Sequence, residues 1–298
     1  MKRVSVIIVT YNSERDIFDC VRSLMSHADI PLEDVELIIV DNDSDDTESM
    51  FDGVRNIWGD DIVLIRNERN GGYGQGNNVG IRKATAPVLL IINPDVRFVG
   101  PFMEKPLRCF GEDKNLIMYG MKQMYSETQV SRNSFWFTTM INGYARTLLT
   151  GLCNRLDIYI PKYMYFSGSC FFVRKEMFEK VGLFDESVFM YGEEDDIHYR
   201  LMRRFGKGFR YDRHIRYIHL MLGRKPNVEY EKKLLEVDVY HHKKKGVSEK
   251  STLTSYLQSN TVLLVRAYIR KVLGGGDDEQ LTVLRDFRRH IKHRLTEL

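Results

Sequence analysis

Three clusters of polar side chains in the N-terminal third of the chain have the composition of a ligand site, and each directly follows an apolar run. The runs are rich in β-branched residues, as expected for strands buried on both faces. Ligands of open α/β sheets bind at the carboxyl ends of the strands, so the shared position of the clusters indicates one site. The clusters and their runs are Thr10-Tyr11-Asn12 after residues 4–9, Asp41-Asn42-Asp43-Ser44 after residues 35–40, and Asn93-Pro94-Asp95 after residues 88–92.

A glycine-rich segment runs from Asn70 to Gly80, between the second and third clusters. Glycine lets the backbone approach a ligand closely and accepts positive φ. We predict a helix over residues 76–85, whose first amide groups suit a diphosphate or a ribose. A dinucleotide-binding turn is excluded by context, because that turn follows the first strand of a βαβ unit and the turn at residues 10–12 contains no glycine.

Four consecutive carboxylates, from Glu193 to Asp196, open a predicted helix over residues 194–205. One interpretation is structural, because the helix dipole favours negative charge in the first turn. The other is catalytic, because a carboxylate crowded by like charges has a raised pKa and can take a proton from a hydroxyl near neutral pH. The pattern alone leaves both interpretations open.

Asp95 is a candidate ligand for a divalent cation, because such an ion on a diphosphate takes only one or two protein carboxylates. Asn93-Pro94-Asp95 is by itself a common turn, and its place after a buried strand is what favours the metal. His219 ends a predicted strand over residues 215–219. A lone histidine is more often structural than a ligand, so the residue type does not decide its role.

Strands and helices alternate along the N-terminal part of the chain, which predicts an α/β fold with a mainly parallel sheet and right-handed crossovers. We expect a catalytic domain over residues 1–225, with a nucleotide-binding half over 1–100 and an acceptor-side half over 101–225. A helical extension is expected over residues 226–298, with Gly274-Gly275-Gly276 between two terminal helices. Further predicted elements are a helix over residues 14–27 and strands over residues 62–65 and 166–173.

The composition is that of an ordered globular protein, with 298 residues, 43% of them hydrophobic, and a net charge of +3. No apolar run is long enough for a transmembrane helix and no signal-peptide pattern is present, so we expect a cytoplasmic protein. The widely spaced cysteines predict reduced thiols and neither disulfides nor a zinc site. They are Cys20, Cys109, Cys153 and Cys170.

The charge is unevenly distributed, since residues 201–298 carry about +11 and residues 1–200 about −8. No stacking motif or zinc knuckle accompanies the basic part, which argues against nucleic acid as a partner. Residues 255–273 combine a broad apolar surface with Arg266, Arg270 and Lys271. This stretch is either an amphipathic helix on an anionic membrane surface, or a helix that packs on the catalytic domain or in a homodimer interface.

Together these segments resemble family 2 glycosyltransferases of the GT-A fold, and more closely their rhamnosyltransferase-like branch. The resemblance covers about residues 3–222, and the combination of motifs is far more specific than any single one. The matching segments are Val4–Ser13 (opening strand and TYN turn), residues 40–44 (VDNxS nucleoside turn), Asn70–Gly80 (NxGfaxanNxG loop), Asn93-Pro94-Asp95 (in place of the DxD metal motif), Ser167-Gly168-Ser169 (start of an SGA-like strand) and residues 181–186 (vGgFDE).

The resemblance implies a role for each matching position in binding the donor. Asp41 would face the pyrimidine base of the nucleoside. A divalent cation, Mg²⁺ or Mn²⁺, would be bound by Asp95 and His219. The remaining donor-binding residues would be Thr10, Tyr11 and Asn12 for the nucleoside, and Asn70, Gly72, Asn77, Asn78 and Asn93 along the rest of the donor.

The chain departs from the family pattern at two acidic positions. Asn93 replaces the first aspartate of the DxD motif, which leaves Asp95 as the main carboxylate ligand. The usual Glu-Asp pair is Glu193-Glu194 here, so the general base is expected to be Glu194, and Glu193 or Asp196 could share its role.

The resemblance therefore predicts an inverting glycosyltransferase that uses a dTDP- or UDP-sugar, with rhamnose as one candidate sugar. Its acceptor would be a hydroxyl of a cell-surface glycan on a lipid carrier, at the inner face of the cytoplasmic membrane. Two other classes use related folds. A sugar nucleotidyltransferase needs a glycine- and basic-rich loop after the first strand, where this chain has Thr10-Tyr11-Asn12. A non-catalytic sugar-nucleotide-binding module would be favoured by lost acids at 95 and 193–196, and these are intact.

Overall fold

The computed structural model describes residues 1–138, 142–220, 227–275 and 277–298. The chain divides into two compact units. The first comprises Met1–Trp136 and Tyr159–Met221, and the second comprises Phe137–Ile158 and Leu222–Leu298. Within the described residues, no helix is both long enough and apolar enough to span a bilayer.

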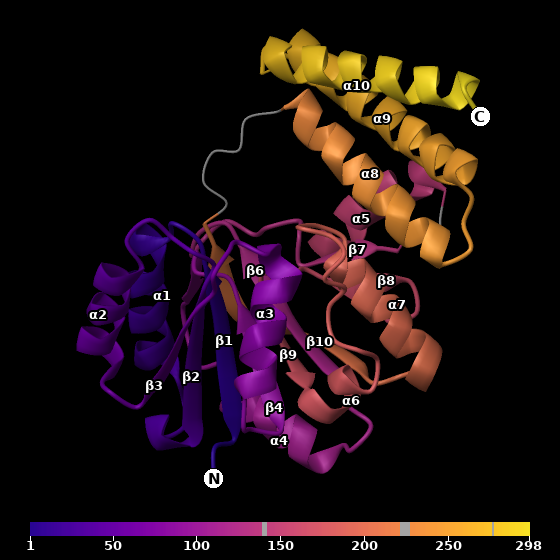
Figure 1. Ribbon diagram of the computed structural model, residues 1–298. Coiled ribbons are helices and arrows are strands. Elements are labelled where there is room, and N and C mark those ends of the chain that lie inside the picture. The colour runs from indigo at the N-terminus through magenta and orange to yellow at the C-terminus, as the bar shows by residue number, and fades with distance from the viewer. Residues whose placement is uncertain (139–141, 221–226, 276) are drawn as a thin grey trace. The chain divides into compact units, whose positions relative to one another are not determined.

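The first unit is built on an eight-stranded sheet with the order β3-β2-β1-β4-β9-β6-β10-β5 (Figure 1). The four strands from β3 to β4 are mutually parallel, and β10 is parallel to β6. β9 runs antiparallel to both of its neighbours, and β5 runs antiparallel to β10. The bounds are β1 Val4–Thr10, β2 Val35–Asp41, β3 Ile62–Arg66, β4 Val88–Ile92, β5 Val96–Phe98, β6 Met118–Met124, β9 Cys170–Arg174 and β10 Phe209–His219.

This arrangement confirms the predicted α/β class and the mainly parallel sheet. Because β1, β2, β4, β6 and β10 all point the same way, their carboxyl ends lie at one edge of the sheet. The start of β9 lies at this edge too, since Cys170 pairs with Ile92. Residues far apart in the sequence are therefore brought to one edge.

Helices cover the sheet through apolar faces at the spacing that the sequence predicts. In α1, Ile17, Cys20, Val21 and Leu24 are buried at intervals of three and four residues, as in a helix with one core-facing stripe. The helices of this unit are α1 Glu14–His27, α2 Thr47–Trp58, α3 Gly72–Lys83, α4 Glu104–Glu112, α6 Lys175–Glu179 and α7 Glu193–Phe205, with a 3₁₀ turn at Leu32–Asp34. A two-stranded ribbon pairs β7 (Phe135–Phe137) with β8 (Met164–Phe166).

Three predicted elements have clearly different bounds in the structure. The strand expected over residues 215–219 is the end of the longer β10, which begins at Phe209. The helix expected over residues 76–85 begins at Gly72, so most of the glycine-rich segment is helical. The strand expected over residues 166–173 is two strands, β8 and β9, separated by the turn Ser167-Gly168-Ser169. The turn carries the polar contacts described below, which a continuous strand would not expose.

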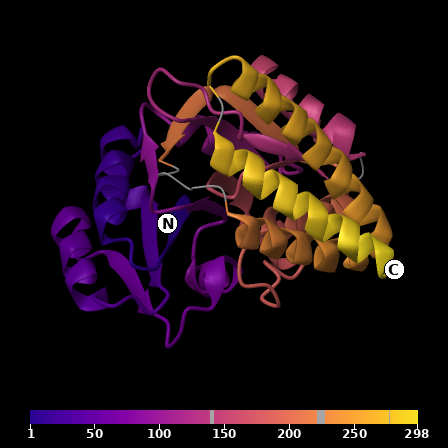
Figure 2. The same cartoon turned by 90° about the horizontal axis from the view of Figure 1, so that it is seen from above.

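The second unit consists of α5 (Gly143–Leu156), α8 (Val228–Lys244), α9 (Glu249–Val272) and α10 (Asp278–Thr296). Its small core contains Leu235, Leu253, Phe287 and Ile291. In the described residues after 226 there are three helices where two were expected, because the chain also turns at Gly246, whose φ is +79°. The C-terminal unit also recruits α5, which packs along α9 and lies N-terminal to the predicted domain boundary (Figure 2).

Candidate active site

The nucleoside turn is organised by a buried carboxylate at the end of β2. Asp41 is fully buried, and Thr10 donates its hydroxyl proton to Asp41 Oδ1 at 2.9 Å. Ser44 donates to both carboxylate oxygens through its hydroxyl and its amide, and the Thr47 hydroxyl donates to Oδ2 at 2.7 Å. These bonds fix the turn after β2 against the end of β1. Contact between Asp41 and a pyrimidine base stays a prediction.

The turns after β1 and β2 are also joined to each other. Asn12 adopts a left-handed φ of 47°, and its amide donates to Ser44 Oγ at 2.8 Å. Its side-chain oxygen accepts from the Asp45 amide at 2.9 Å. Tyr11, between Thr10 and Asn12, leaves 52% of its surface exposed. The predicted nucleoside residues are thus adjacent, and Tyr11 presents an aromatic ring on which a base can stack.

The glycines of α3 let this helix lie close to neighbouring protein atoms, in addition to the approach to a ligand that their pattern predicts. A Cβ on Gly80 would lie 2.7 Å from Ile7 Cγ2, and one on Gly76 would lie 2.7 Å from Val9 Cγ1. Both glycines therefore let the helix pack directly on β1. Gly72 has a φ of +84°, and a Cβ there would lie 1.7 Å from the Phe189 carbonyl oxygen. Close approach to protein atoms, and not only to a ligand, accounts for these glycines.

Gly80→Ala is expected to lower the free energy of unfolding by about 1–2 kcal/mol, because the added methyl group overpacks a buried contact. Urea denaturation measures this. Gly111→Ala is the matched control, since Gly111 also lies in a helix but a Cβ there meets nothing within 4 Å. Equal stabilities for the two variants would contradict the packing role of Gly80.

Two asparagines connect the nucleoside turn to α3: Asn42, which belongs to the predicted polar cluster after β2, and Asn67, which the sequence did not mark as a site residue. Asn42 is buried, and its side-chain amide donates to the Gly72 carbonyl at 3.0 Å. Asn67 donates to Asn42 Oδ1 at 2.7 Å and to Gln75 Oε1 at 3.1 Å. Asn70, predicted to bind the donor, accepts the Gly72 amide at 3.0 Å. Asn42 stands inside the VDNxS motif, so the motif itself was the available signal.

Asn77 and Asn78 differ in how their side chains are used. Asn78 donates to the Phe184 carbonyl at 3.0 Å and to Glu186 at 2.8 Å, and it accepts the Phe184 amide at 3.0 Å. Its amide therefore joins α3 to the FDE segment, and a direct role at the donor stays a prediction. The buried Asn77 donates to the Tyr73 carbonyl at 2.9 Å.

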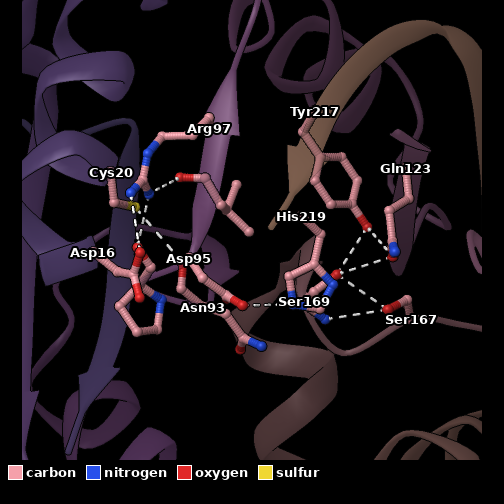
Figure 3. Close-up of polar contacts among 12 residues, drawn as sticks. Asp16, Cys20, Asn93, Asp95, Arg97, Gln123, Ser167, Ser169, Tyr217 and His219 are labelled. Atoms are coloured by element: carbon pink, nitrogen blue, oxygen red, sulfur yellow. Dashed lines mark hydrogen bonds and ion pairs between the residues drawn. The ribbon is translucent and has the colours of Figure 1, made fainter. Parts of the chain in front are cut away.

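The two predicted metal ligands lie next to each other. Asp95 follows β4 and His219 ends β10, and Asp95 Oδ2 lies 3.2 Å from His219 Nε2 (Figure 3). Adjacent ligand atoms of an octahedral ion at 2.0–2.1 Å are about 3 Å apart, so this pair fits two positions around one divalent cation. A carboxylate and an imidazole also suit such an ion chemically.

The turn that carries Asp95 is held by contacts from both sides. The Arg97 guanidinium donates to the Pro94 carbonyl at 3.0 Å and pairs with Asp16 at 3.4 Å. The backbone amide of Asn93, the predicted donor residue of this turn, donates to the Ser169 carbonyl at 2.9 Å. A buried network continues from Ser169, whose hydroxyl lies 3.0 Å from the Tyr217 hydroxyl (Figure 3).

The acidic motif opens α7, as predicted, and its members have different surroundings. Glu194 Oε1 accepts the Gly168 amide at 3.1 Å. The carbonyl of the same Gly168 accepts the Tyr73 hydroxyl proton at 2.7 Å. Glu194 is half-buried, whereas Glu193, Asp195 and Asp196 are buried. Of the acidic candidates, Glu194 is therefore the one held toward the turn that precedes β9.

Asp196 is engaged elsewhere. It is buried, and the Arg200 guanidinium pairs with it at 2.6 Å. Arg200 in turn donates to the Val181 carbonyl at 2.5 Å. The Asp196 carboxylate is therefore engaged in an ion pair within α7 itself. The arrangement favours a structural role for Asp196.

Glu193 is only 1% exposed and faces α3, with its Cγ 3.7 Å from the place of a Cβ on Gly74. Burial, together with the negative charge of Glu194, raises the pKa of Glu193 to about 8. A neutral Glu193 beside a charged Glu194 avoids placing two negative charges in one buried position. Glu193 is therefore protonated, and uncharged, near neutral pH.

Glu193→Gln is expected to reduce the loss of thermal stability as pH rises from 4.5 to 8. In this window the unfolded chain ionises Glu193 while the folded chain keeps it protonated, so the wild type loses stability with rising pH. Melting temperatures across the window test this, with the exposed Glu127→Gln as control. If Glu193→Gln and the wild type melt in parallel throughout, Glu193 ionises normally.

The sheet order, the polar turns at its carboxyl edge and the acidic start of α7 define a nucleotide-sugar transferase of the GT-A fold. A family model described as glycosyl transferase family 2 matches residues 5–182, which is more than half of the chain. The chain therefore belongs to glycosyl transferase family 2.

Sequence relatives carry related descriptions. The low-salt glycan biosynthesis hexosyltransferase Agl10 of Haloferax volcanii is 27% identical over 205 residues, covering 67% of this chain and 62% of that protein. The uncharacterized glycosyltransferase YfnE of Bacillus subtilis is 24% identical over 258 residues, covering 73% of this chain and 64% of that protein. The chain thus spans less than two thirds of either relative.

Solved structures agree in fold. The mannosyltransferase PcManGT from Pyrobaculum calidifontis, in complex with GDP-Man and Mn²⁺, superposes with a TM-score of 0.61 at 13% identity, covering 99% of this chain and 87% of that one. TarS from S. aureus gives a TM-score of 0.55 at 16% identity, covering 86% of this chain and 42% of that one. At these identities the likeness concerns the fold alone.

Proposed function

We propose that the chain is an inverting hexosyltransferase that moves a sugar from a nucleoside diphosphate to a hydroxyl of a glycan acceptor. One observation carries the proposal. In the turn Ser167-Gly168-Ser169, Gly168 bonds to Glu194 and the Ser169 carbonyl accepts the amide of Asn93. The proposed proton acceptor and the turn proposed to hold the cation are therefore attached to adjacent residues, as a single displacement at one carbon would require.

In the proposed reaction, Glu194 accepts the proton of the acceptor hydroxyl. The acceptor oxygen then bonds to the anomeric carbon from the face opposite the leaving group, and the bond from that carbon to the diphosphate oxygen breaks. The nucleoside diphosphate leaves with the bonding electrons. No covalent intermediate with the protein is needed, because one carboxylate suffices for general-base catalysis.

Asp95 and His219 are the residues that would hold Mg²⁺ or Mn²⁺ in this reaction. A divalent cation bound there would stabilise the negative charge that develops on the departing diphosphate. The mannosyltransferase PcManGT was solved in complex with Mn²⁺, which makes this cation a suitable first choice in assays.

The donor is proposed to be a dTDP- or UDP-sugar, with rhamnose as one candidate, and the acceptor a cell-surface glycan on a lipid carrier. The names of relatives support the general setting, since one is a glycan biosynthesis hexosyltransferase and another is a poly(ribitol-phosphate) beta-glucosyltransferase. The reaction would take place in the cytoplasm, at the inner face of the membrane that carries the acceptor.

The proposal is tested by incubating the protein with a panel of sugar nucleotides, including GDP-mannose, and measuring released nucleoside diphosphate. Release with one donor, increased by acceptor, supports it. Release of pyrophosphate from a sugar phosphate and a nucleoside triphosphate would instead identify a nucleotidyltransferase. Tight binding of a donor with no turnover under any acceptor condition would identify a binding module.

A further inference from the structure

The helix α5 has its polar and apolar faces reversed relative to an ordinary surface helix. Its buried positions are Gly143, Thr150, Cys153 and Asn154, which are small or polar. Its large apolar side chains recur every fourth residue on the exposed side, where positions i and i+4 share one face. They are Tyr144, Leu148, Leu152 and Leu156, each about half exposed. A helix that only supported the fold would bury this stripe.

The contact of α5 with α9 explains why the buried face is polar. Gly143 donates its amide to Gln258 Oε1 at 2.8 Å, and its carbonyl accepts the Ser259 hydroxyl at 3.1 Å. A Cβ on Gly143 would lie 1.8 Å from the Ser255 carbonyl oxygen, so the two backbones are in close contact. The helix is thereby fixed with its leucines directed away from α9.

The second half of α9 is exposed and apolar in the same way. Its first half contributes Leu253 to the core of the unit, whereas Val272 and the following Leu273 are 85% and 79% exposed. The other exposed apolar side chains of this half are Leu263, Val265, Tyr268 and Ile269. α5 packs along α9, and Figure 2 shows the two helices side by side. Apolar patches of this kind mark interaction sites.

The charge on these segments is entirely positive. Residues 138–156 contain Arg146 and Arg155 and no acidic residue. Residues 250–276 contain four cations and likewise no Asp or Glu; the cations are Lys250, Arg266, Arg270 and Lys271. Lys271 pairs with Asp278 of α10, so Arg155, Arg266 and Arg270 supply the positive charge beside the exposed apolar side chains. Exposed leucines next to these arginines complement a surface that is apolar within and anionic at its boundary.

We infer that the exposed side of α5 and the second half of α9 form a docking surface for an anionic lipid bilayer. Leu148 and Leu152 enter the boundary between headgroups and acyl chains, while Arg155 and Arg270 contact anionic headgroups. A second copy of this chain fits less well, because a symmetric contact would bring the cations of the two copies together. The inference goes beyond the proposed reaction and does not depend on it.

Sedimentation of the full chain with vesicles tests this surface. The wild type is expected to bind vesicles of phosphatidylcholine mixed with phosphatidylglycerol at low salt, to be released at high salt, and to leave pure phosphatidylcholine vesicles unbound. The double variant Leu148→Gln/Leu152→Gln is expected to bind these vesicles at least about tenfold more weakly than the wild type. Leu32→Gln, at an exposed leucine of the first unit, is the matched control and is expected to bind like the wild type.

Arg155→Gln/Arg270→Gln separates the charge contribution from the apolar one. Each cation near an anionic surface contributes about fivefold to partitioning, so this variant is expected to bind roughly 25-fold more weakly at low salt. Circular dichroism melting of each variant confirms folding. Absence of wild-type binding at low salt, or undiminished binding by both double variants, would overturn the inference. So would a dimer in sedimentation velocity that the leucine variant dissociates without any vesicle binding.

Discussion

Glu194→Gln is expected to lower turnover by about 10²-fold or more while leaving donor affinity nearly unchanged. Glutamine keeps the shape of the side chain and an oxygen that can still accept the Gly168 amide. It cannot accept the proton of the acceptor hydroxyl, so only the chemical step should suffer. Steady-state release of nucleoside diphosphate gives the turnover, and isothermal titration with the donor gives the affinity.

Two neighbouring substitutions serve as controls for this result. Glu193→Gln makes the same chemical substitution at the neighbouring position. It is expected to retain most activity, because Glu193 is already neutral near pH 7. Asp196→Asn removes the charge that pairs with Arg200, so its effect should be mainly on stability. If Glu193→Gln is the crippling change, the base has been assigned to the wrong residue, although the mechanism survives.

The second large effect is expected at the cation site, where Asp95→Ala should reduce activity by about 10²-fold or more. The variant removes the carboxylate that lies 3.2 Å from His219. Excess EDTA should abolish wild-type turnover, and Mn²⁺ should restore it to the wild type but not to Asp95→Ala. Binding of Mn²⁺ in the presence of a nucleoside diphosphate, followed by electron paramagnetic resonance, gives a readout independent of activity.

Asp60→Ala is the control for Asp95→Ala, because Asp60 is an exposed aspartate on the loop before β3. It should behave like the wild type in both assays. Full turnover in excess EDTA, with Asp95→Ala unimpaired, would show that the reaction needs no cation at this position.

The sheet was predictable where hydrophobic patterning is strong and local. Residues 4–9, 35–40, 62–65 and 88–92 are largely apolar runs that correspond to β1 to β4. β1, β2 and β4 are buried and therefore need mostly apolar side chains, whereas β3, at the edge of the sheet, is only partly buried. The place of β9 between β4 and β6 was not predictable, since strand order depends on pairing between distant segments.

Contacts between distant segments also limited what the sequence could predict about the candidate site. Asp95 stood out because it follows a buried strand, but His219 gained a role only from the family resemblance, because its partner is distant in sequence. The α5 helix escaped prediction for another reason. Its leucines repeat with helical spacing but face outward, and a sequence pattern does not tell an exposed apolar stripe from a buried one.

The antiparallel strand β9 limits how the catalytic unit can be recombined. A sheet made of a nucleotide half and an acceptor half would offer a seam near residue 100 at which segments from different transferases could be exchanged. Here β9 pairs along all five residues of β4 and also with β6, so the strand next to the nucleotide half comes from a segment far along the chain. A chimaera that takes its donor specificity from another enzyme must therefore import β9 and the turn before it together with β1 to β4.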